Sequence, residues 1–489
     1  AKNLATEITN HNVKQNNLQG QNSITNEHIT NNKNVRKLLD DSDLEDRLDA
    51  QFYWEDMDFA NCIKLSKIAK VSGGKRLPKG FDYSKDNTNY RYLRIGNINW
   101  DSTLDYDNFK YISEELYMKL KHYEIHNNDL LLAIVGATIG KCSLLNIPNN
   151  DKIILTENCA KIKITDYAVL PHYLLFLLQS NFVQKQIQLN YVQTTLPKLG
   201  LDRVLSLYLP TFPSKKRQQE LLDIYQSAFL LKKQKEKQAK DLLDSIDTYL
   251  LDELGITLQE IDNSLEKRIF KVNLSDISGG RYDAEAFLPY YEKIYQCIDK
   301  SKYQKQTLSC IVSKINRRFT AIENKEYDYI QLGSIGRDNS EVEKPLKIKL
   351  PDIPSRAQQI VKTNEILFSI ANPQWGNHIL VKEVNNNFIA SSGFIILDSN
   401  ENNNYITEIL RSNLYKKLYE KYLTGSGLFL NISTKDLLSI KIPLPSIEKQ
   451  NEIAKHIQTI RDNAKQLKFE ATQDLENAKL KVEKMILGQ

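Results

Sequence analysis

The feature that most constrains the fold is an internal repeat: six segments of the first half of the chain recur in the second half. The matched segments are 47–50 and 281–284, 90–98 and 327–335, 128–132 and 364–368, 180–181 and 412–413, 205–210 and 438–443, and 217–220 and 449–452. They keep their order, and the offset stays between 232 and 237 residues. Ordered recurrence at one spacing indicates that a single structural unit occurs twice.

Each copy combines a globular part with a long charged segment. The globular part has short apolar segments separated by Gly, Pro and Asn turns, which favour a mixed α/β domain. It ends in a Pro-rich exit, where proline does no harm to the helix that begins next. Residues 1–46 are rich in asparagine and are predicted to be a tail or linker. The expected boundaries are a first domain at 47–213, a helix at 214–258, a linker and second domain at 259–445, and a final helix at 446–489.

The two long segments have the apolar spacing of a coiled coil. In the second segment the apolar residues are Ile453, Ile457, Ile460, Ala464, Leu467 and Ala471, then, after a four-residue stutter, Leu475, Ala478, Val482 and Met485. In the first they are Leu221, Tyr225, Ala228, Leu242, Ile246 and Tyr249, interrupted by the Lys-rich stretch 232–240. A seam this narrow needs a partner helix. The predicted fold class is α+β, with two α/β domains joined by two long antiparallel coiled-coil helices in a pseudo-two-fold internal repeat.

Composition excludes several classes of protein. The five cysteines lie far apart without a CxxC pair, which argues against a zinc site or a disulfide framework. No apolar run reaches the roughly 20 residues of a membrane span, and the first residues lack the plan of a secretory signal. We therefore expect a cytoplasmic protein with no membrane partner and no metal.

Basic residues are concentrated at the same point of both copies, although the whole chain is nearly neutral, with 66 Lys and Arg against 61 Asp and Glu. Residues 64–94 hold nine basic and two acidic side chains, and residues 300–318 hold six basic and none acidic. A single lysine here is more often a solvated surface charge. The repeated patch favours contact with an anionic polymer such as double-stranded DNA. The candidate DNA-binding residues are Lys75, Arg76, Lys79, Arg94, Lys141, Lys198, Arg317, Arg318, Arg337, Gln374 and Trp375.

Three polar loops are further candidates for reading bases. The turn 372–377 carries a tryptophan and two amides, so it is either a base-reading loop or a turn in which the tryptophan caps the core. The loops 194–200 and 424–431 occupy corresponding places in the two copies, and we expect them to face the same side of their domains.

Three segments are similar to catalytic motifs without matching them. Residues 136–141 have three residues between the glycines and a cysteine after the lysine, so they are not a phosphate-binding loop. Residues 372–375 differ from the Asn-Pro-Pro-aromatic turn of adenine methyltransferases at the third position. Residues 323–325 have the Glu-x-Lys spacing of nucleases without a fitting Pro-Asp partner. The chain is therefore expected not to be an enzyme.

The ordered repeat resembles the specificity subunit of Type I restriction–modification systems. The resemblance lies in the exits at 209–218 and 442–450 and in the segments 72–76, 92–98 and 135–141. It implies that each domain reads one half of a bipartite DNA target. It also implies that the helices dock two methyltransferase subunits, and that restriction subunits join that complex. The partners would methylate adenine at N6 with S-adenosylmethionine or cleave with ATP and Mg²⁺, and this chain would bind no cofactor.

Two other interpretations are open at this point. The chain is alternatively the specificity region of a Type II-like single-chain methyltransferase–endonuclease, since similar Arg-x-Asp-Ala openings occur where such enzymes pass into that region. A coiled-coil interaction protein without a DNA function is the third interpretation, and it leaves the duplicated basic patches unexplained.

Overall fold

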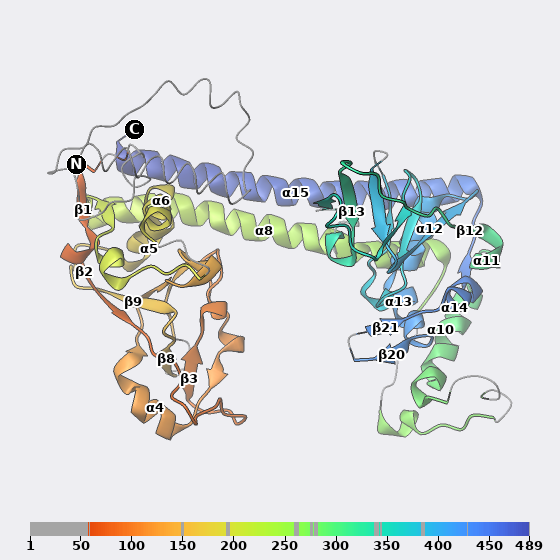
Figure 1. Ribbon diagram of the computed structural model, residues 1–489, viewed down its shortest axis with the longest axis horizontal. Helices are drawn as coiled ribbons and strands as arrows, with labels where there is room; N and C mark the ends of the chain where they lie inside the picture. The colour runs from red at the N-terminus through yellow and green to blue at the C-terminus, as the bar shows by residue number, and fades with distance from the viewer. Residues whose placement is uncertain are drawn as a thin grey trace. The chain divides into compact units, whose positions relative to one another are not determined.

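The computed structural model describes residues 57, 59–147, 151–191, 196–258, 264–273, 277, 282–336, 342, 345–382, 387–427 and 429–488 (Figure 1). The chain divides into unit 1, residues 1–229 with 475–489, and unit 2, residues 230–474. Both long helices contribute to both units, and each unit is described in turn. The predicted tail at 1–46 and the candidate Arg337 lie outside the described residues.

The described residues of unit 1 form two four-stranded sheets and one two-stranded sheet. The antiparallel sheet β2-β9-β6-β7 comprises Ala69–Gly73, Cys159–Ile164, Leu130–Ala133 and Cys142–Leu144. The sheet β4-β3-β8-β5 comprises Lys110–Tyr111, Tyr90–Leu93, Lys152–Leu155 and Glu124–Ile125, with only β3 and β8 parallel. Strands β1 (Cys62–Lys64) and β10 (Tyr208–Pro210) pair, so the start of the domain lies beside its exit.

Strand β6 shows how the sequence positions this sheet between two cores. Its side chains alternate between the faces of the sheet, as the geometry of a strand requires. Leu130 and Leu132 pack into the core shared with the helices, whereas Leu131 packs into the core shared with the second sheet. The helices of unit 1 before the long helix are α4 (Glu114–Leu120), α5 (Pro171–Gln179), α6 (Asn181–Asn190) and α7 (Leu201–Leu205). In Figure 1, α5 and α6 lie beside the beginning of α8.

Unit 2 repeats the same strand pairing. The sheet β12-β19-β16-β17 comprises Val312–Ile315, Phe394–Ser399, Ile366–Ser369 and Ile379–Leu380. The sheet β14-β13-β18-β15 comprises Leu346–Ile348, Tyr327–Ile330, Phe388–Ser391 and Ala357–Ile360, with β13 and β18 parallel. Strands β11 (Lys305–Thr307) and β22 (Lys441–Pro443) pair as β1 and β10 do. The identical pairing in both units confirms the internal repeat.

The remaining elements of unit 2 are helical, apart from one hairpin. The helices are α10 (Pro289–Asp299), α11 (Leu308–Ile311), α12 (Asn403–Arg411), α13 (Asn413–Glu420) and α14 (Thr434–Ser439). The hairpin is β20 (Thr424–Ser426) with β21 (Phe429–Asn431). Short 3-10 turns are η2 (Leu65–Lys67), η3 (Ile95–Asn97), η4 (Tyr106–Asn108), η5 (Lys121–Tyr123) and η6 (Gly136–Thr138) in unit 1, and η7 (Leu265–Arg268), η8 (Ala284–Phe287), η9 (Leu332–Ser334) and η10 (Pro373–Trp375) in unit 2.

The two long helices are α8 (Lys215–Leu254) and α15 (Ile447–Leu487), and they pack antiparallel. In unit 2, Lys235 lies 2.9 Å from Glu470, whereas Lys449 lies 2.9 Å from Glu253, so later residues of α8 meet earlier residues of α15. In unit 1, Leu221 near the start of α8 shares a core with Val482 near the end of α15. The buried seam residues are Leu221, Ile246, Ile453, Ile457, Ile460, Ala464, Ala471 and Val482. The predicted fold class is confirmed.

A buried glutamine fastens each domain to the helix that follows it. Gln218 Oε1 accepts a hydrogen bond from the backbone N–H of Leu170 (2.9 Å), and its Nε2 donates to Ala168 O and Pro213 O. Gln450 is its counterpart: Oε1 accepts from Asn402 N–H (3.1 Å), and Nε2 donates to Glu401 Oε2 and Pro445 O. Both side chains are fully buried. Each amide therefore ties the Pro-rich exit to the segment before α5 or α12.

An acidic residue fastens each domain to the long helix of the other repeat. The N–H of Asn181, at the start of α6, donates to Glu483 Oε1 on α15 (2.7 Å). The N–H of Asn413, at the start of α13, donates to Asp247 Oδ1 on α8 (3.0 Å). A carboxylate suits a helix start, because the first N–H groups have no partner within the helix and carry partial positive charge. Each domain thus holds both long helices.

Replacing Asp247 by asparagine is expected to remove a pH dependence of stability. Burial raises the pKa of Asp247, as it does that of Glu483. A raised pKa in the folded state means that folding favours the protonated carboxyl. That contribution is complete below the unfolded value of about 4 and is lost as the pH rises through the folded pKa. Asparagine keeps an oxygen that accepts from Asn413 N–H but carries no charge. The stability of the variant relative to the wild type should therefore increase between pH 4 and pH 7 in urea titrations, and a constant difference would contradict this assignment.

Candidate nucleic-acid interface

The same turn, with positive φ at two positions, follows the central strand in both units. In unit 1 the turn around η6 has positive φ at Gly136 (74°) and Gly140 (96°). In unit 2 the turn around η10 has positive φ at Asn372 (48°) and Gly376 (71°). These conformations are open to glycine and, among other residues, are adopted most readily by asparagine. Segments 136–141 and 372–375, which are similar to catalytic motifs without matching them, therefore form the same turn in the two units, with different side chains.

A second loop lies against each of these turns. In unit 1 the N–H of Gly136 donates to Pro197 O (2.8 Å), and Val135 forms a β-bridge with Lys198. In unit 2 the N–H of Asn372 donates to Leu430 O (2.7 Å), and Ala371 forms a β-bridge with Asn431. We call residues 135–141 with 196–200 loop pair 1, and residues 371–377 with 424–427 and 429–431 loop pair 2. The expectation that the second loops occupy corresponding places is confirmed for Pro197 and Lys198 and for Leu430 and Asn431. Residues 194, 195 and 428 of the predicted loops lie outside the described residues.

Loop pair 1 and the segment 83–100 of unit 1 carry cations beside exposed aromatic rings. Lys141 Nζ donates to Ile98 O (3.2 Å) and lies 5.4 Å from the centroid of the Trp100 ring, and Trp100 is 62% exposed. The Arg94 guanidinium lies 5.8 Å from the ring of the exposed Tyr83. Lys198 is exposed on the second loop. Cations attract phosphates, and exposed rings offer stacking surfaces, so this combination suits nucleic acid.

The candidate lysines and arginine after β2 lie on a segment bonded to the same part of unit 1. The N–H of Lys75 donates to Leu155 O (2.9 Å), and Asn158 O, three residues later, accepts from Ile134 N–H just before loop pair 1. Lys75, Arg76 and Lys79 are exposed. Arg76 Nε donates to Glu157 Oε1 (2.6 Å), and this hydrogen bond raises the pKa of Arg76. All three side chains are accessible to a phosphate.

Loop pair 2 carries amides where loop pair 1 carries cations, although Asn372 and Asn377 are buried. Trp375 is 45% exposed, and Gln374 Nε2 lies 3.5 Å from Asn372 Oδ1. Gln374 Oε1 and Asn377 Oδ1 are buried and have no hydrogen-bond partner among the described residues. Amide side chains can pair with the N6 and N7 edge of adenine. The sequence left base reading and core capping open for this turn, and the exposure of Trp375 argues against core capping.

Behind this turn, His378 is a core residue. It is fully buried, its ring stacks on Phe368 at 3.8 Å between centroids, and its Nδ1 accepts from Ser369 N–H (3.1 Å). Burial holds the pKa of His378 well below its usual value, so the ring is neutral at pH 7. The neutral ring supports the turn from beneath and adds no charge to it.

The arginine candidates of unit 2 differ in their surroundings. Arg317 forms an ion pair with the buried Glu365 and donates to Ile360 O (2.9 Å), so it fixes the segment before β13 within the fold. Arg318 is exposed and bridges to Gln359 through the backbone. The structure thus gives Arg317 a structural partner that the sequence did not predict.

Some relevant residues were not predicted from the sequence. Trp100 and Tyr83 were not selected, although exposed aromatics beside the basic segment were a usable signal. Gln218 and Gln450 were matched between the repeats, but nothing in the local sequence indicated their bonds to Leu170 and Asn402. Among the described residues, no group of His, Cys, Asp and Glu is placed to hold a metal ion. In the same part of the chain, no helix is long and apolar enough to cross a membrane.

Comparison with known proteins identifies the family to which this chain is related. The model of the Type I restriction modification DNA specificity domain matches residues 60–253 and 304–477, one match in each repeat. A specificity subunit assigned to the type I restriction enzyme MjaX of Methanocaldococcus jannaschii is 41% identical over 73 residues, which are 15% of this chain and 17% of the relative. The MjaVIII specificity subunit of the same organism is 29% identical over 136 residues, 27% of this chain and 32% of the relative. The chain thus aligns with less than half the length of these relatives.

A solved structure shares the fold. A chain from a structure described as showing complex assembly and conformational transition of the type I R-M system has a TM-score of 0.50 and 14% identity, covering 87% of this chain and 97% of that chain. Identity this low speaks for the fold alone. The family model, however, matches more than half of the chain and places one domain in each repeat. The chain therefore belongs to the family of Type I restriction–modification DNA specificity subunits, which are non-catalytic.

Proposed function

We propose that this chain reads a bipartite sequence in double-stranded DNA, with one half-site contacted by loop pair 1 and the other by loop pair 2. The observation that carries the proposal is the repeated position of the two loop pairs, built on the same turn in two domains with the same strand pairing. The side chains differ between the two, cations and Trp100 in one and amides and Trp375 in the other. The two half-sites should therefore differ in sequence.

The long helices supply the remaining parts of the proposal. Helices of 40 and 41 residues are about 60 Å long at 1.5 Å per residue, which is long enough to set a spacer of unread base pairs between two half-sites. Exposed apolar residues on them, among them Leu230, Phe469 and Leu480, offer surface for partner helices. We assign these partners as two methyltransferase subunits, joined by restriction subunits. The complex would act in the cytoplasm on N6 of adenine or by cleavage, with S-adenosylmethionine, ATP and Mg²⁺ bound by the partners.

Sequencing the methylated bases in a host that expresses this chain with its methyltransferase tests the proposal. The expected result is one motif with two separated, dissimilar specific parts containing N6-methyladenine. A continuous motif would overturn the bipartite assignment.

The triple variant Lys75→Glu, Arg76→Glu and Lys79→Glu is expected to bind one half-site more weakly and to leave the other unaffected. Neutralised phosphates make affinity salt-dependent, so the slope of log K against log salt should fall by about 1 for each phosphate that the variant no longer neutralises. Binding is measured on duplexes in which one half-site or the other is scrambled. The control reverses three exposed lysines of α15, Lys455, Lys465 and Lys484, which changes the net charge equally. Equal weakening in both triple variants would show that only net charge is acting.

A further inference from the structure

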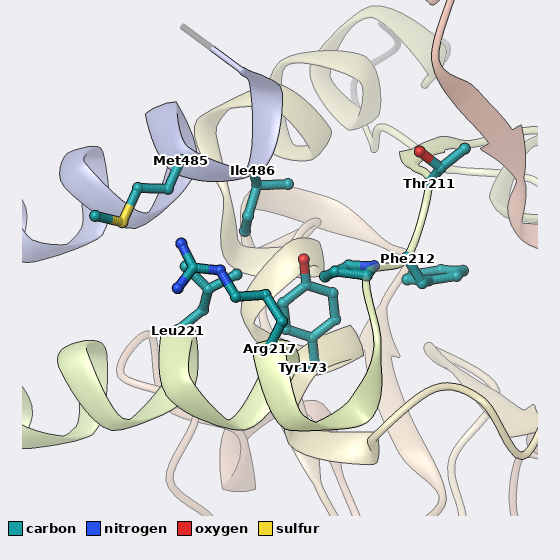
Figure 2. Close-up of a pocket in the computed structure, with 8 residues that line it drawn as sticks. Tyr173, Thr211, Phe212, Arg217, Leu221, Met485 and Ile486 are labelled. Atoms are coloured by element: carbon teal, nitrogen blue, oxygen red, sulfur yellow. The ribbon is translucent and has the colours of Figure 1, made fainter.

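A cavity of about 240 Å³ lies in unit 1 where α5, the Pro-rich exit, the start of α8 and the end of α15 meet. Figure 2 shows Arg217 and Leu221 from α8 facing Met485 and Ile486 from α15, with Tyr173 and Phe212 beside them. The cavity is smaller than the roughly 300 Å³ at which sites for drug-sized ligands begin. It therefore suits a group the size of one amino-acid residue.

Tyr173 is the unusual member of this lining. The residue is 1% exposed, and its Oη is buried without a hydrogen-bond partner among the described residues. Its ring packs edge-on against Phe212, at 6.3 Å between centroids. Burial raises the pKa of Tyr173 to about 12, so the hydroxyl keeps its proton at pH 7. Buried hydroxyls in folded proteins are nearly always bonded, so an unpaired one that lines a cavity indicates a missing acceptor.

At the corresponding place in unit 2, the polar side chains bind other residues of the same unit. Tyr405, the counterpart of Tyr173, donates its hydroxyl to Pro443 O (2.8 Å). Lys449, the counterpart of Arg217, binds Glu253 of α8 (2.9 Å). With the four-residue stutter included, Met485 corresponds to Tyr249, whose ring packs on His456 at 4.2 Å. Both cations also pair with a glutamate on their own helix, Arg217 with Glu220 (3.0 Å) and Lys449 with Glu452 (2.9 Å). Among the described residues, Arg217 has no counterpart of the ion pair that Lys449 makes with the other long helix. The two copies therefore differ in the bonding of the tyrosine hydroxyl, in the cation and in the residue at position 485 or 249, and these groups line the cavity in unit 1.

We propose that the cavity of unit 1 binds an apolar carboxylate. Its apolar part would lie among Phe212, Leu221 and Ile486, and its carboxylate would accept from Tyr173 Oη and the Arg217 guanidinium. A hydroxyl donor and a guanidinium that line the same cavity fit a carboxylate, and the apolar side chains of the lining suit the remainder of the group. The last residue of a polypeptide and a free aromatic or aliphatic acid share this chemistry.

The chain carries a built-in probe for this site, because its only methionines are Met57, Met118 and Met485. The full chain is labelled with ¹³C at the methionine methyl groups and titrated with N-acetyl-phenylalanine, 3-phenylpropanoate and N-acetyl-phenylalaninamide. The Met485 signal is expected to shift with both acids at millimolar concentration, and the amide should bind at least about tenfold more weakly because it lacks the charge. Met118, exposed on α4, should not respond. Tighter binding of N-acetyl-phenylalanine would assign the site to a chain end, and tighter binding of 3-phenylpropanoate to a free acid.

Two matched variants complete the test. Tyr173→Phe keeps the ring and removes the unpaired hydroxyl, so it should weaken binding of the acids about tenfold. Tyr405→Phe removes the satisfied hydroxyl of unit 2 and should leave the titration unchanged. A urea titration of each variant followed by Trp100 fluorescence shows that unit 1 is folded. The proposal is overturned if Met485 does not respond to either acid, if acid and amide bind equally, or if Tyr173→Phe binds as the wild type does. None of these outcomes depends on DNA binding.

Discussion

Replacing Arg461 by leucine is expected to lower the free energy of unfolding of unit 2 by about 3–5 kcal/mol. Arg461 on α15 binds Glu408 on α12 through two hydrogen bonds, Nη2 to Oε2 at 2.6 Å and Nε to Oε1 at 3.1 Å. The two side chains are 10% and 5% exposed. Removing the arginine leaves a buried carboxylate without its partner, which costs more than the pair itself contributes. Urea unfolding followed by Trp375 fluorescence, in a Trp54→Phe, Trp100→Phe background, measures this decrease.

The double variant separates the unpaired charge from the loss of packing. Arg461→Leu with Glu408→Leu removes both charges, and it should recover most of the stability because an apolar pair of similar volume is often as stable as a buried ion pair. Lys417→Leu is the control for an exposed pair, since Lys417 and Glu420 lie 3.1 Å apart at the surface, and it should cost less than about 1 kcal/mol. If Arg461→Leu costs no more than this control, the pair does not fasten α12 to α15.

Replacing Gln450 by leucine is expected to cost about 3 kcal/mol of unit 2 stability. The substitution removes three hydrogen bonds worth about 1 kcal/mol each and leaves Asn402 N–H and Pro445 O without this partner. The same urea titration measures the decrease. Gln466→Leu is the matched control, because Gln466 is an exposed residue of the same helix whose side chain bonds Glu470 one turn away (3.0 Å).

Gln218, the counterpart of Gln450 in the first repeat, allows a second test of this prediction. Gln218→Leu should destabilise unit 1 by a similar amount, and the fluorescence of Trp100, in a Trp54→Phe, Trp375→Phe background, reports on that unit. Destabilisation of both units by either single variant would show that the glutamines do not act separately on their own domains. If Gln450→Leu lowers the free energy of unfolding of unit 2 no more than Gln466→Leu does, Gln450 does not hold its domain to α15.

The sequence by itself determined the repeat, the order of the elements and the long helices, because these depend on local patterns. Alternation along Leu130–Ala133 fixes which side chains can share a face of the sheet. The spacing of Ile453, Ile457 and Ile460 fixes the seam of α15, and all three residues are buried. The turns at Gly136 and Asn372 follow from residues that tolerate positive φ.

Only the tertiary structure decided which residues meet across long distances along the chain. Glu483 meets Asn181 and Asp247 meets Asn413 because the antiparallel helices place each acidic residue beside the domain of the other repeat. The same packing leaves Tyr173 Oη without a partner among the described residues and gives Tyr405 one, although the two tyrosines occupy equivalent positions in the sequence. The packing also pairs Arg317 with Glu365 in an ion pair. Spacing along the chain sets local conformation, but the partner of a buried polar group depends on how separate elements pack.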